Sequence, residues 1–260
     1  MSSLQLHYRS YGDPGSRPLL LLHGLLGSSA NWHSIARGLE GDFRVIVPDL
    51  RNHGRSPHSQ EMDYPLMADD LVALIQRLEL GGADLVGHSL GGKVAMHLAL
   101  QAPELVRSLV VVDIAPVRYG HRFQTMIAAL QGLDLAGLDN RQQADRYLAD
   151  HLDDPGVRQY LLQNLVKEQG RWGWRMYLDG LIRAMPELMD FPAANGRQFP
   201  GPALFLYGGA SAYVQPEHAG AIRERFPLAR LRMVAGAGHW VYAEQPEAFL
   251  LALTGFLGRD

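Results

Sequence analysis

Leu85-Val86-Gly87-His88-Ser89-Leu90-Gly91-Gly92 is the stretch of the 260-residue sequence that decides its fold. It contains Gly-x-Ser-x-Gly directly after an apolar, β-branched run and directly before a segment with helical spacing of apolar residues. In so tight a strand-to-helix turn the central residue is held in a strained backbone conformation, and glycines two residues away on either side avoid clashes with it. The pattern therefore predicts that Ser89 presents its hydroxyl above a sheet, at the positive end of the following helix.

Short apolar runs of the kind that form buried strands recur along the chain. They occupy residues 19–22, 44–47, 84–86, 109–112, 203–207 and 231–234. Turn-forming Gly, Pro, Asp or His follows closely after each run, and amphipathic helical stretches, such as residues 67–78 and 93–101, lie between several of them. This alternation predicts an α/β fold with a mostly parallel, doubly wound sheet that helices cover on both faces.

One interval breaks the alternation. Between residues 117 and 199 no strand-like run is visible, and apolar residues recur at helical spacing in 123–130, 144–152, 157–166 and 172–182. An interval of about 80 residues is far longer than a single crossover needs. We therefore expect residues 117–199 to form an all-helical cap, inserted over the C-terminal edge of a core that residues 1–116 and 200–260 build.

His239 is the histidine best placed to act as a base toward Ser89. It lies in Gly236-Ala237-Gly238-His239-Trp240, after the last predicted strand and before a helix that Gln245-Pro246-Glu247 signals. A loop at that point belongs to the C-terminal edge of the sheet, which is also the edge of Ser89. An imidazole there can take the proton of the serine hydroxyl as a general base.

Two carboxylates compete for the role of orienting His239. Asp113 follows the run Val110-Val111-Val112, so it stands at the C-terminal end of the strand after the helix that Ser89 begins. From there it can reach the imidazole of a neighbouring strand end and hold its tautomer. Glu217 is the poorer alternative, because it comes several residues after the loop that follows residues 203–207. The predicted catalytic residues are therefore Ser89, Asp113 and His239.

The oxyanion of an acyl-transfer intermediate needs backbone N–H donors. Leu90 supplies one directly after the serine, and Leu25, after His23-Gly24, supplies the other. The polar loop of residues 49–56 is expected to brace the loop of Leu25 by hydrogen bonds rather than to bind a metal. The side chains expected to contact substrate are Leu26, His88, Trp172 and Trp240.

Composition excludes several other kinds of chemistry. The absence of cysteine removes disulfides, thiolate metal sites and cysteine nucleophiles. The 24 basic and 27 acidic residues leave a net charge of −3, which offers no footprint for nucleic acid or for an anionic membrane surface. The first residues carry no basic region followed by an apolar stretch, so we expect a cytoplasmic protein without membrane insertion. Neither a metal nor an organic cofactor is implied, and the oligomeric state cannot be read from the sequence.

Together these segments resemble the α/β-hydrolase superfamily, and more narrowly the small bacterial YbfF-type esterases. The narrower resemblance is carried by Arg51-Asn52-His53-Gly54, by Asp113-Ile114-Ala115-Pro116, by the acid-free Gly208-Gly209-Ala210-Ser211 and by Gly238-His239-Trp240-Val241. It implies a serine esterase or acyl-CoA thioesterase whose acid follows the strand after the nucleophile helix, and it therefore supports Asp113. The resemblance also implies that the cap selects the substrate.

We therefore predict a serine hydrolase that cleaves small to medium carboxylic esters or thioesters through an acyl-enzyme intermediate, with a small-molecule ester or thioester as its partner. A carbon–carbon bond hydrolase or a lyase would use the same three residues. A small-molecule receptor built on a hydrolase scaffold is a rival from another class. Arg118 and Arg122, at the start of the insertion, could meet an acidic acyl group or a CoA phosphate, although solvated charges are the more ordinary reading.

Overall fold

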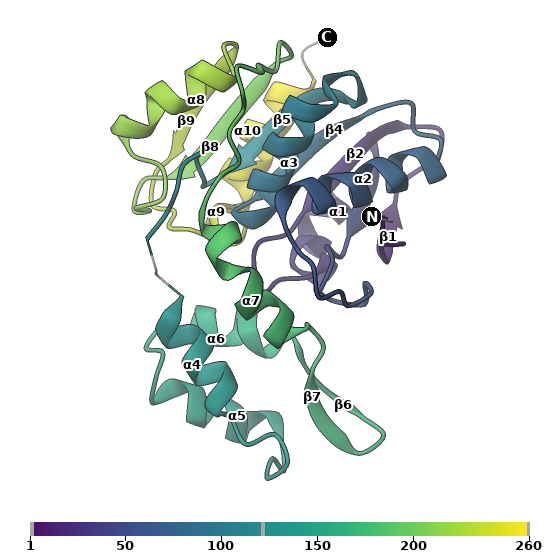
Figure 1. The fold of residues 1–260 in the computed structure, drawn as a ribbon. Coiled ribbons are helices and arrows are strands. Elements are labelled where there is room, and N and C mark those ends of the chain that lie inside the picture. The colour runs from purple at the N-terminus through teal and green to yellow at the C-terminus, as the bar shows by residue number, and fades with distance from the viewer. Residues whose placement is uncertain (1–2, 121–122, 259–260) are drawn as a thin grey trace.

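The computed structural model describes residues 3–120 and 123–258. Within this part of the chain, the main sheet has seven strands in the order β1-β3-β2-β4-β5-β8-β9 (Figure 1). They are β1 (Tyr8–Tyr11), β2 (Arg17–Leu22), β3 (Phe43–Pro48), β4 (Ala83–His88), β5 (Val106–Val112), β8 (Ala203–Gly208) and β9 (Ala229–Val234). Neighbouring strands are parallel except for β1, which pairs antiparallel with β3. The predicted α/β fold with a mostly parallel sheet is confirmed.

Strand β1 is one that the hydrophobic pattern does not predict. It lies at the edge of the sheet, where its Tyr8 and Tyr11 are half-buried and the two residues between them are exposed. A strand with one neighbour and a solvated side needs no continuous apolar run. The search for buried runs therefore detects the interior strands and passes over this one.

Helices cover both faces of the sheet, because successive strand residues point to opposite sides. Leu20 and Leu22 of β2 belong to the hydrophobic cluster that contains α2 (Tyr64–Arg77) and α3 (Leu90–Gln101). Leu19 and Leu21 belong to the cluster on the other face, with α1 (His33–Leu39) and α10 (Pro246–Leu257). The short α8 (Ala219–Arg225) adds Ile222 to the first cluster.

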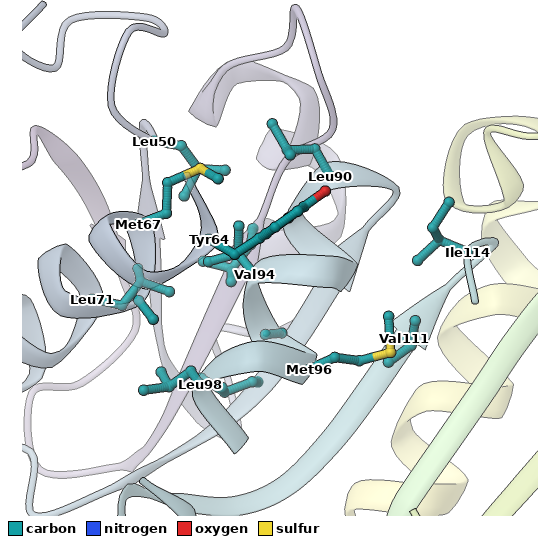
Figure 2. Close-up of a cluster of buried hydrophobic side chains, with 14 of the residues drawn as sticks. Leu50, Tyr64, Met67, Leu71, Leu90, Val94, Met96, Leu98, Val111 and Ile114 are labelled. Carbon is teal, nitrogen blue, oxygen red and sulfur yellow. The ribbon is translucent and has the colours of Figure 1, made fainter. Parts of the chain in front are cut away.

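The helix that begins directly after Ser89 is held firmly by this packing. Figure 2 shows Met96 of α3 pointing toward Val111 of β5, and Tyr64 of α2 and Val94 of α3 belong to the same hydrophobic cluster. All four side chains are at most 2% exposed. A helix buried along most of its length is rigidly placed, so its first turn is a stable platform for a functional group.

The inserted segment forms a lobe beyond one end of the sheet (Figure 1). It contains α4 (Gln124–Gly132), α5 (Arg141–Ala149), α6 (Pro155–Leu162) and α7 (Leu178–Met189). It also contains an antiparallel hairpin of β6 (Leu165–Glu168) and β7 (Arg171–Trp174), so the expectation of an all-helical insertion is wrong. Gln169 and Gly170 join the two strands with φ of 49° and 81°, the left-handed pair that a two-residue hairpin turn requires. The sequence did not predict this hairpin because apolar residues recur at helical spacing on both sides of its turn, in 157–166 and 172–182.

The insertion rests on the loops that follow β2 and β3. The Tyr160 hydroxyl of α6 donates a hydrogen bond to the carbonyl of Leu25 at 3.0 Å. Asn164 Nδ2 donates to the carbonyl of Leu26 at 2.6 Å, and the backbone N–H of Tyr177 donates to Asn52 at 2.9 Å. These contacts therefore lie at the C-terminal edge of the sheet, where the sequence predicts Ser89, Asp113 and His239.

The helices are short by comparison with a bilayer. A helix needs about 20 predominantly apolar residues to cross the hydrocarbon core, whereas α2 spans 14 residues and α3 and α10 span 12 each. Across residues 3–120 and 123–258, no helix combines the length and the apolarity that a membrane span requires.

Candidate active site

Ser89 occupies the sharp turn between β4 and α3 that the sequence predicts. Its φ of 52° and ψ of −117° lie outside the usual regions for a residue with a side chain. Close backbone approach requires the glycines around it. A Cβ on Gly87 would stand 2.2 Å from the carbonyl oxygen of Gly91, and a Cβ on Gly91 would stand 2.5 Å from that of Leu22. The turn is fixed by a hydrogen bond from the N–H of Ser89 to the carbonyl of Val112 at 3.0 Å.

Strained backbone is concentrated around this point. Besides Ser89, the non-glycine residues Leu26, Asn52 and Asp113 have φ between 53° and 64°. Each stands just after a strand that ends at the same edge of the sheet, namely β2, β3 and β5. Because each such conformation costs about 1–3 kcal/mol, a group of them at one edge is typical of a functional site.

His239 meets Asp113 where the sequence predicts that it should. The distance from His239 Nδ1 to Asp113 Oδ2 is 2.7 Å. A carboxylate accepts, so Nδ1 carries the proton and Nε2 of the neutral ring is free to take one. The ring of Tyr213 stacks on that of His239 with 4.0 Å between centroids. Ser89 and His239 line the same hollow, which has a volume of about 170 Å³.

Asp113 is itself held in place by donors. Its side chain is fully buried, and Oδ1 accepts the backbone N–H of Gly208 at 3.1 Å. The Ser211 hydroxyl donates to Oδ2, the oxygen that His239 also contacts. The weaker candidate, Glu217, lies in the short 3₁₀ turn Pro216–His218. Of the two carboxylates considered, Asp113 is the one that the structure brings to His239.

Two further residues hold the loop of His239: His88, which the sequence analysis placed among the substrate contacts, and Glu244, which it did not single out. His88 Nε2 lies 2.9 Å from the carbonyl oxygen of His239, which can only accept, so Nε2 carries a proton and donates it. Burial, together with the neighbouring His239, lowers the pKa of His88 well below its ordinary value. Glu244 accepts the N–H of Gly238 at 2.6 Å and that of Trp240 at 3.0 Å. The spacing His239-x₄-Glu244 could have suggested such a cap.

The loop that carries Leu25 is braced as expected. The N–H of Leu26 donates to Nε2 of His53 at 3.1 Å, while Nδ1 of His53 donates to the carbonyl of Arg51 at 2.9 Å. Burial lowers the pKa of His53 to about 3, so the ring is neutral and its Nε2 can accept. His23 acts in the same way, since its Nε2 accepts the N–H of Leu50 at 3.0 Å.

Two hollows of different character meet at Ser89. The wide hollow, of about 170 Å³, is lined by His88, His239, Trp240 and Tyr160 in addition to residues that it shares with the other. The narrow hollow, of about 20 Å³, is lined by Lys93, Ile114, Leu188 and Met189, likewise in addition to the shared residues. Leu25, Ser89, Phe123 and Tyr213 line both.

The two predicted oxyanion donors both border these hollows. Leu25 lines both, and Leu90 lines the narrow one. Leu90 is the first residue of α3, where a backbone N–H has no partner within the helix. The structure therefore places both residues beside Ser89, as the proposed role requires.

Of the four side chains predicted to contact substrate, two line the wide hollow and two line neither hollow. His88 and Trp240 line the wide hollow. Leu26 lines neither hollow, because its side chain packs in the hydrophobic core, where it is 1% exposed. Trp172 also lines neither, because β7 directs it to a separate cluster within the insertion, under the ammonium of Lys167. These two placements correct the predicted substrate contacts.

The structure gives little support to Arg118 and Arg122 as contacts for an acidic acyl group or a CoA phosphate. Arg118 is exposed, with its guanidinium 3.9 Å from Asp190, and Arg122 lies outside the described residues. Over the described part of the chain, no group of three or more His, Asp or Glu side chains is arranged to hold a metal ion.

Comparison with known proteins identifies the family. The family model described as "alpha/beta hydrolase fold" matches residues 17–246. The chain belongs to the α/β hydrolase fold family. It is 43% identical over 254 residues to the mouse "sn-1-specific diacylglycerol lipase ABHD11", covering 95% of this chain and 82% of the relative. It is 38% identical over 241 residues to "Esterase YbfF" of Escherichia coli strain K12, covering 92% of each.

A solved structure agrees with these sequence relatives. The "Marine microorganism esterase" superimposes with a TM-score of 0.95 at 36% identity, covering 98% of this chain and all of the other. The resemblance to the α/β-hydrolase superfamily and to the YbfF-type esterases is confirmed, and so is the prediction of an enzyme of the carboxylic ester hydrolase class.

Proposed function

We propose that this chain hydrolyses carboxylic esters and thioesters of small to medium acyl groups with Ser89 as nucleophile, His239 as general base and Asp113 as the carboxylate that orients it. One observation carries the proposal. The buried Asp113 contacts His239 Nδ1 at 2.7 Å, while His239 and the strained Ser89 line one hollow. The esterase and lipase names of the relatives support this class of reaction.

In the first step, Ser89 Oγ attacks the carbonyl carbon of the ester as His239 Nε2 takes its proton. The carbonyl oxygen becomes an oxyanion, which accepts the N–H groups of Leu25 and Leu90. The positive end of α3 favours the same negative charge. Asp113 stabilises the imidazolium and holds its Nδ1 proton, which leaves Nε2 as the atom that exchanges protons with the reactants.

In the second step the carbon–oxygen or carbon–sulfur bond to the leaving group breaks, and His239 gives its proton to that group. A water molecule then attacks the acyl-enzyme, with His239 again as base, and releases the carboxylic acid and Ser89. The two transfers return every residue to its starting protonation state. In this scheme residues 117–199 act as a cap over the core of residues 1–116 and 200–260.

The test is a titration with a fluorophosphonate probe combined with turnover of p-nitrophenyl esters. We expect one label per chain and turnover well above about one per minute, since enzymes of this kind commonly turn over many times per second. Stoichiometric labelling with slower turnover would favour the small-molecule receptor. Turnover of a carbon–carbon substrate in preference to every ester would favour the hydrolase or lyase that uses the same residues.

A further inference from the structure

The narrow hollow contains a buried cation that the proposed reaction does not use. Lys93 lies one helical turn after Ser89 on α3, and its N–H donates to the carbonyl of Ser89 at 3.0 Å. Its side chain is 2% exposed and lines the narrow hollow. A fully buried lysine is rare and costs free energy unless its ammonium is satisfied.

The ammonium of Lys93 is satisfied by the end of the cap helix α7. Nζ lies 2.6 Å from the carbonyl oxygen of Asp190, 3.2 Å from that of Met189 and 3.5 Å from that of Leu188. These are carbonyls that a helix leaves without partners at its C-terminus, where a cation is also favoured by the helix dipole. Three donors thus meet three acceptors, so the ammonium is occupied by protein rather than directed at a ligand.

Two tyrosines fasten the same helix end. The Tyr64 hydroxyl donates to the carbonyl of Leu188 at 2.6 Å. The backbone N–H of Tyr119 donates to Met189 at 2.8 Å. The Lys93 ammonium lies 5.8 Å and 5.0 Å from the two ring centroids. Leu188 and Met189, whose carbonyls are held in this way, form one wall of the narrow hollow.

The position of His239 decides which part of a substrate enters each hollow. The histidine must give its proton to the leaving group, so the leaving group lies on the side that His239 lines. That side is the wide hollow. The acyl chain, attached to the same carbonyl carbon, then points into the narrow hollow, which contains Ser89 and Leu90 but not His239.

The narrow hollow has little room. Its volume of about 20 Å³ compares with the roughly 10–15 Å³ that a single water molecule needs by the same measure. An acyl group of acetyl or propionyl size fills it, and a longer chain requires the end of α7 to move. We propose that Lys93, as a positioning residue that fixes this wall, restricts the enzyme to short acyl groups. This inference rests on the proposed function.

The experiment measures kcat/KM of the full chain for p-nitrophenyl acetate, butyrate and octanoate. Wild type is expected to favour acetate over octanoate by at least about tenfold. Lys93→Met keeps the length of the side chain but removes the donors, and it should raise the octanoate-to-acetate ratio about tenfold, the effect of losing hydrogen bonds from one charged group. Tyr64→Phe removes one neutral hydrogen bond to the same wall and should raise the ratio about threefold.

The chain provides a matched control, because Lys93 and Lys167 are its two lysines. Lys167 is exposed on β6, so Lys167→Met should leave the ratio unchanged. Leu188→Ala opens the wall directly and should raise the ratio even if Lys93→Met fails to fold. A general loss of stability would lower both rates together and would not change their ratio.

Two results would overturn the inference. One is wild-type hydrolysis of octanoate as efficient as that of acetate. The other is an unchanged ratio in folded Lys93→Met, or in Tyr64→Phe and Leu188→Ala if Lys93→Met does not fold. Failure of the proposed function looks different, since acetate turnover would then be absent in wild type or would survive Ser89→Ala.

Discussion

The wide and narrow hollows share Leu25, Ser89, Phe123 and Tyr213 but differ in the chemistry of the residues that line only one of them. The wide hollow is lined by two imidazoles whose ring centroids are 4.6 Å apart, and one of them is held by a buried carboxylate. Apart from the shared residues, the narrow hollow is lined by the apolar side chains of Leu90, Ile114, Leu188 and Met189, by Tyr119, and by Lys93, whose Nζ donates to carbonyls within the protein. The two hollows should therefore have different effects on activity. Substitutions on the wide side should lower the rate of hydrolysis of every ester, whereas those on the narrow side should change which ester is preferred.

The largest effect should come from the residue common to both sides. Ser89→Ala removes the attacking oxygen, so we expect kcat for all esters to fall by about 10⁴-fold or more, to the level that binding and the oxyanion donors alone support. The measurement is turnover of p-nitrophenyl acetate and octanoate by protein of matched folding. Retained turnover of either ester would mean that the nucleophile is not Ser89.

The next effect tests the wide side. Asp113→Asn removes the charge that orients His239 and should lower kcat by about 10²- to 10⁴-fold for every chain length, because the imidazole loses its preferred tautomer. Glu217→Gln is the matched control and should change kcat little. A larger loss for Glu217→Gln than for Asp113→Asn would assign the orienting carboxylate to Glu217. It would contradict the role proposed for the contact between Asp113 and His239.

A smaller effect should follow from Glu244→Gln. Glu244 accepts the N–H groups on both sides of His239, and an amide can accept only with its one oxygen. Loss of one charge-assisted hydrogen bond should lower kcat/KM about tenfold for all esters and leave the octanoate-to-acetate ratio unchanged. A change in that ratio would show that the two hollows are coupled through the loop of His239.

The last effect concerns stability on the narrow side rather than the rate of hydrolysis. Burial lowers the pKa of Lys93 from 10.5 to about 7, although Asp190 acts in the opposite direction. Between about pH 7 and pH 10 the unfolded chain therefore binds more protons at this residue than the folded chain, so its free energy of unfolding rises with pH. Relative to Lys93→Met, wild type should gain at most about 1.4 kcal/mol per pH unit in this range.

Urea unfolding of both proteins at several pH values measures this difference, because titrations common to both cancel. A constant difference from pH 7 to pH 10 would show that Lys93 keeps its ordinary pKa. A difference that falls with rising pH would show that the carbonyls of α7 stabilise the charged form.

Ser89, Asp113 and His239 could be predicted from sequence because each stands next to a short motif or a strand end that the sequence itself shows. The turn at Ser89 needs glycines at fixed positions, and these are visible as letters. Asp113 follows the buried strand β5 and His239 follows the edge strand β9, and both parallel strands end at the edge of the sheet where Ser89 stands, although β8 lies between them. The bracing of Leu26 by His53 was predictable for the same reason.

The insertion and the supporting contacts could not be predicted in the same way. The hairpin strands β6 and β7 overlap the ends of two stretches, 157–166 and 172–182, whose apolar spacing also suits a helix, and packing within the insertion decides between the two structures. That hairpin also carries Trp172 away from Ser89. The partners of Lys93 lie nearly 100 positions away along the chain, at the end of α7. No local sequence pattern shows where that helix packs.

The most direct measurement is peptide mass spectrometry after reaction with the fluorophosphonate probe, with ester turnover followed in the same samples. We predict one phosphonyl group per chain, on Ser89, and loss of turnover in proportion to labelling for every chain length. Modification of a different residue, or full turnover by fully labelled protein, would contradict the assignment of Ser89 as the nucleophile at the junction of the two hollows.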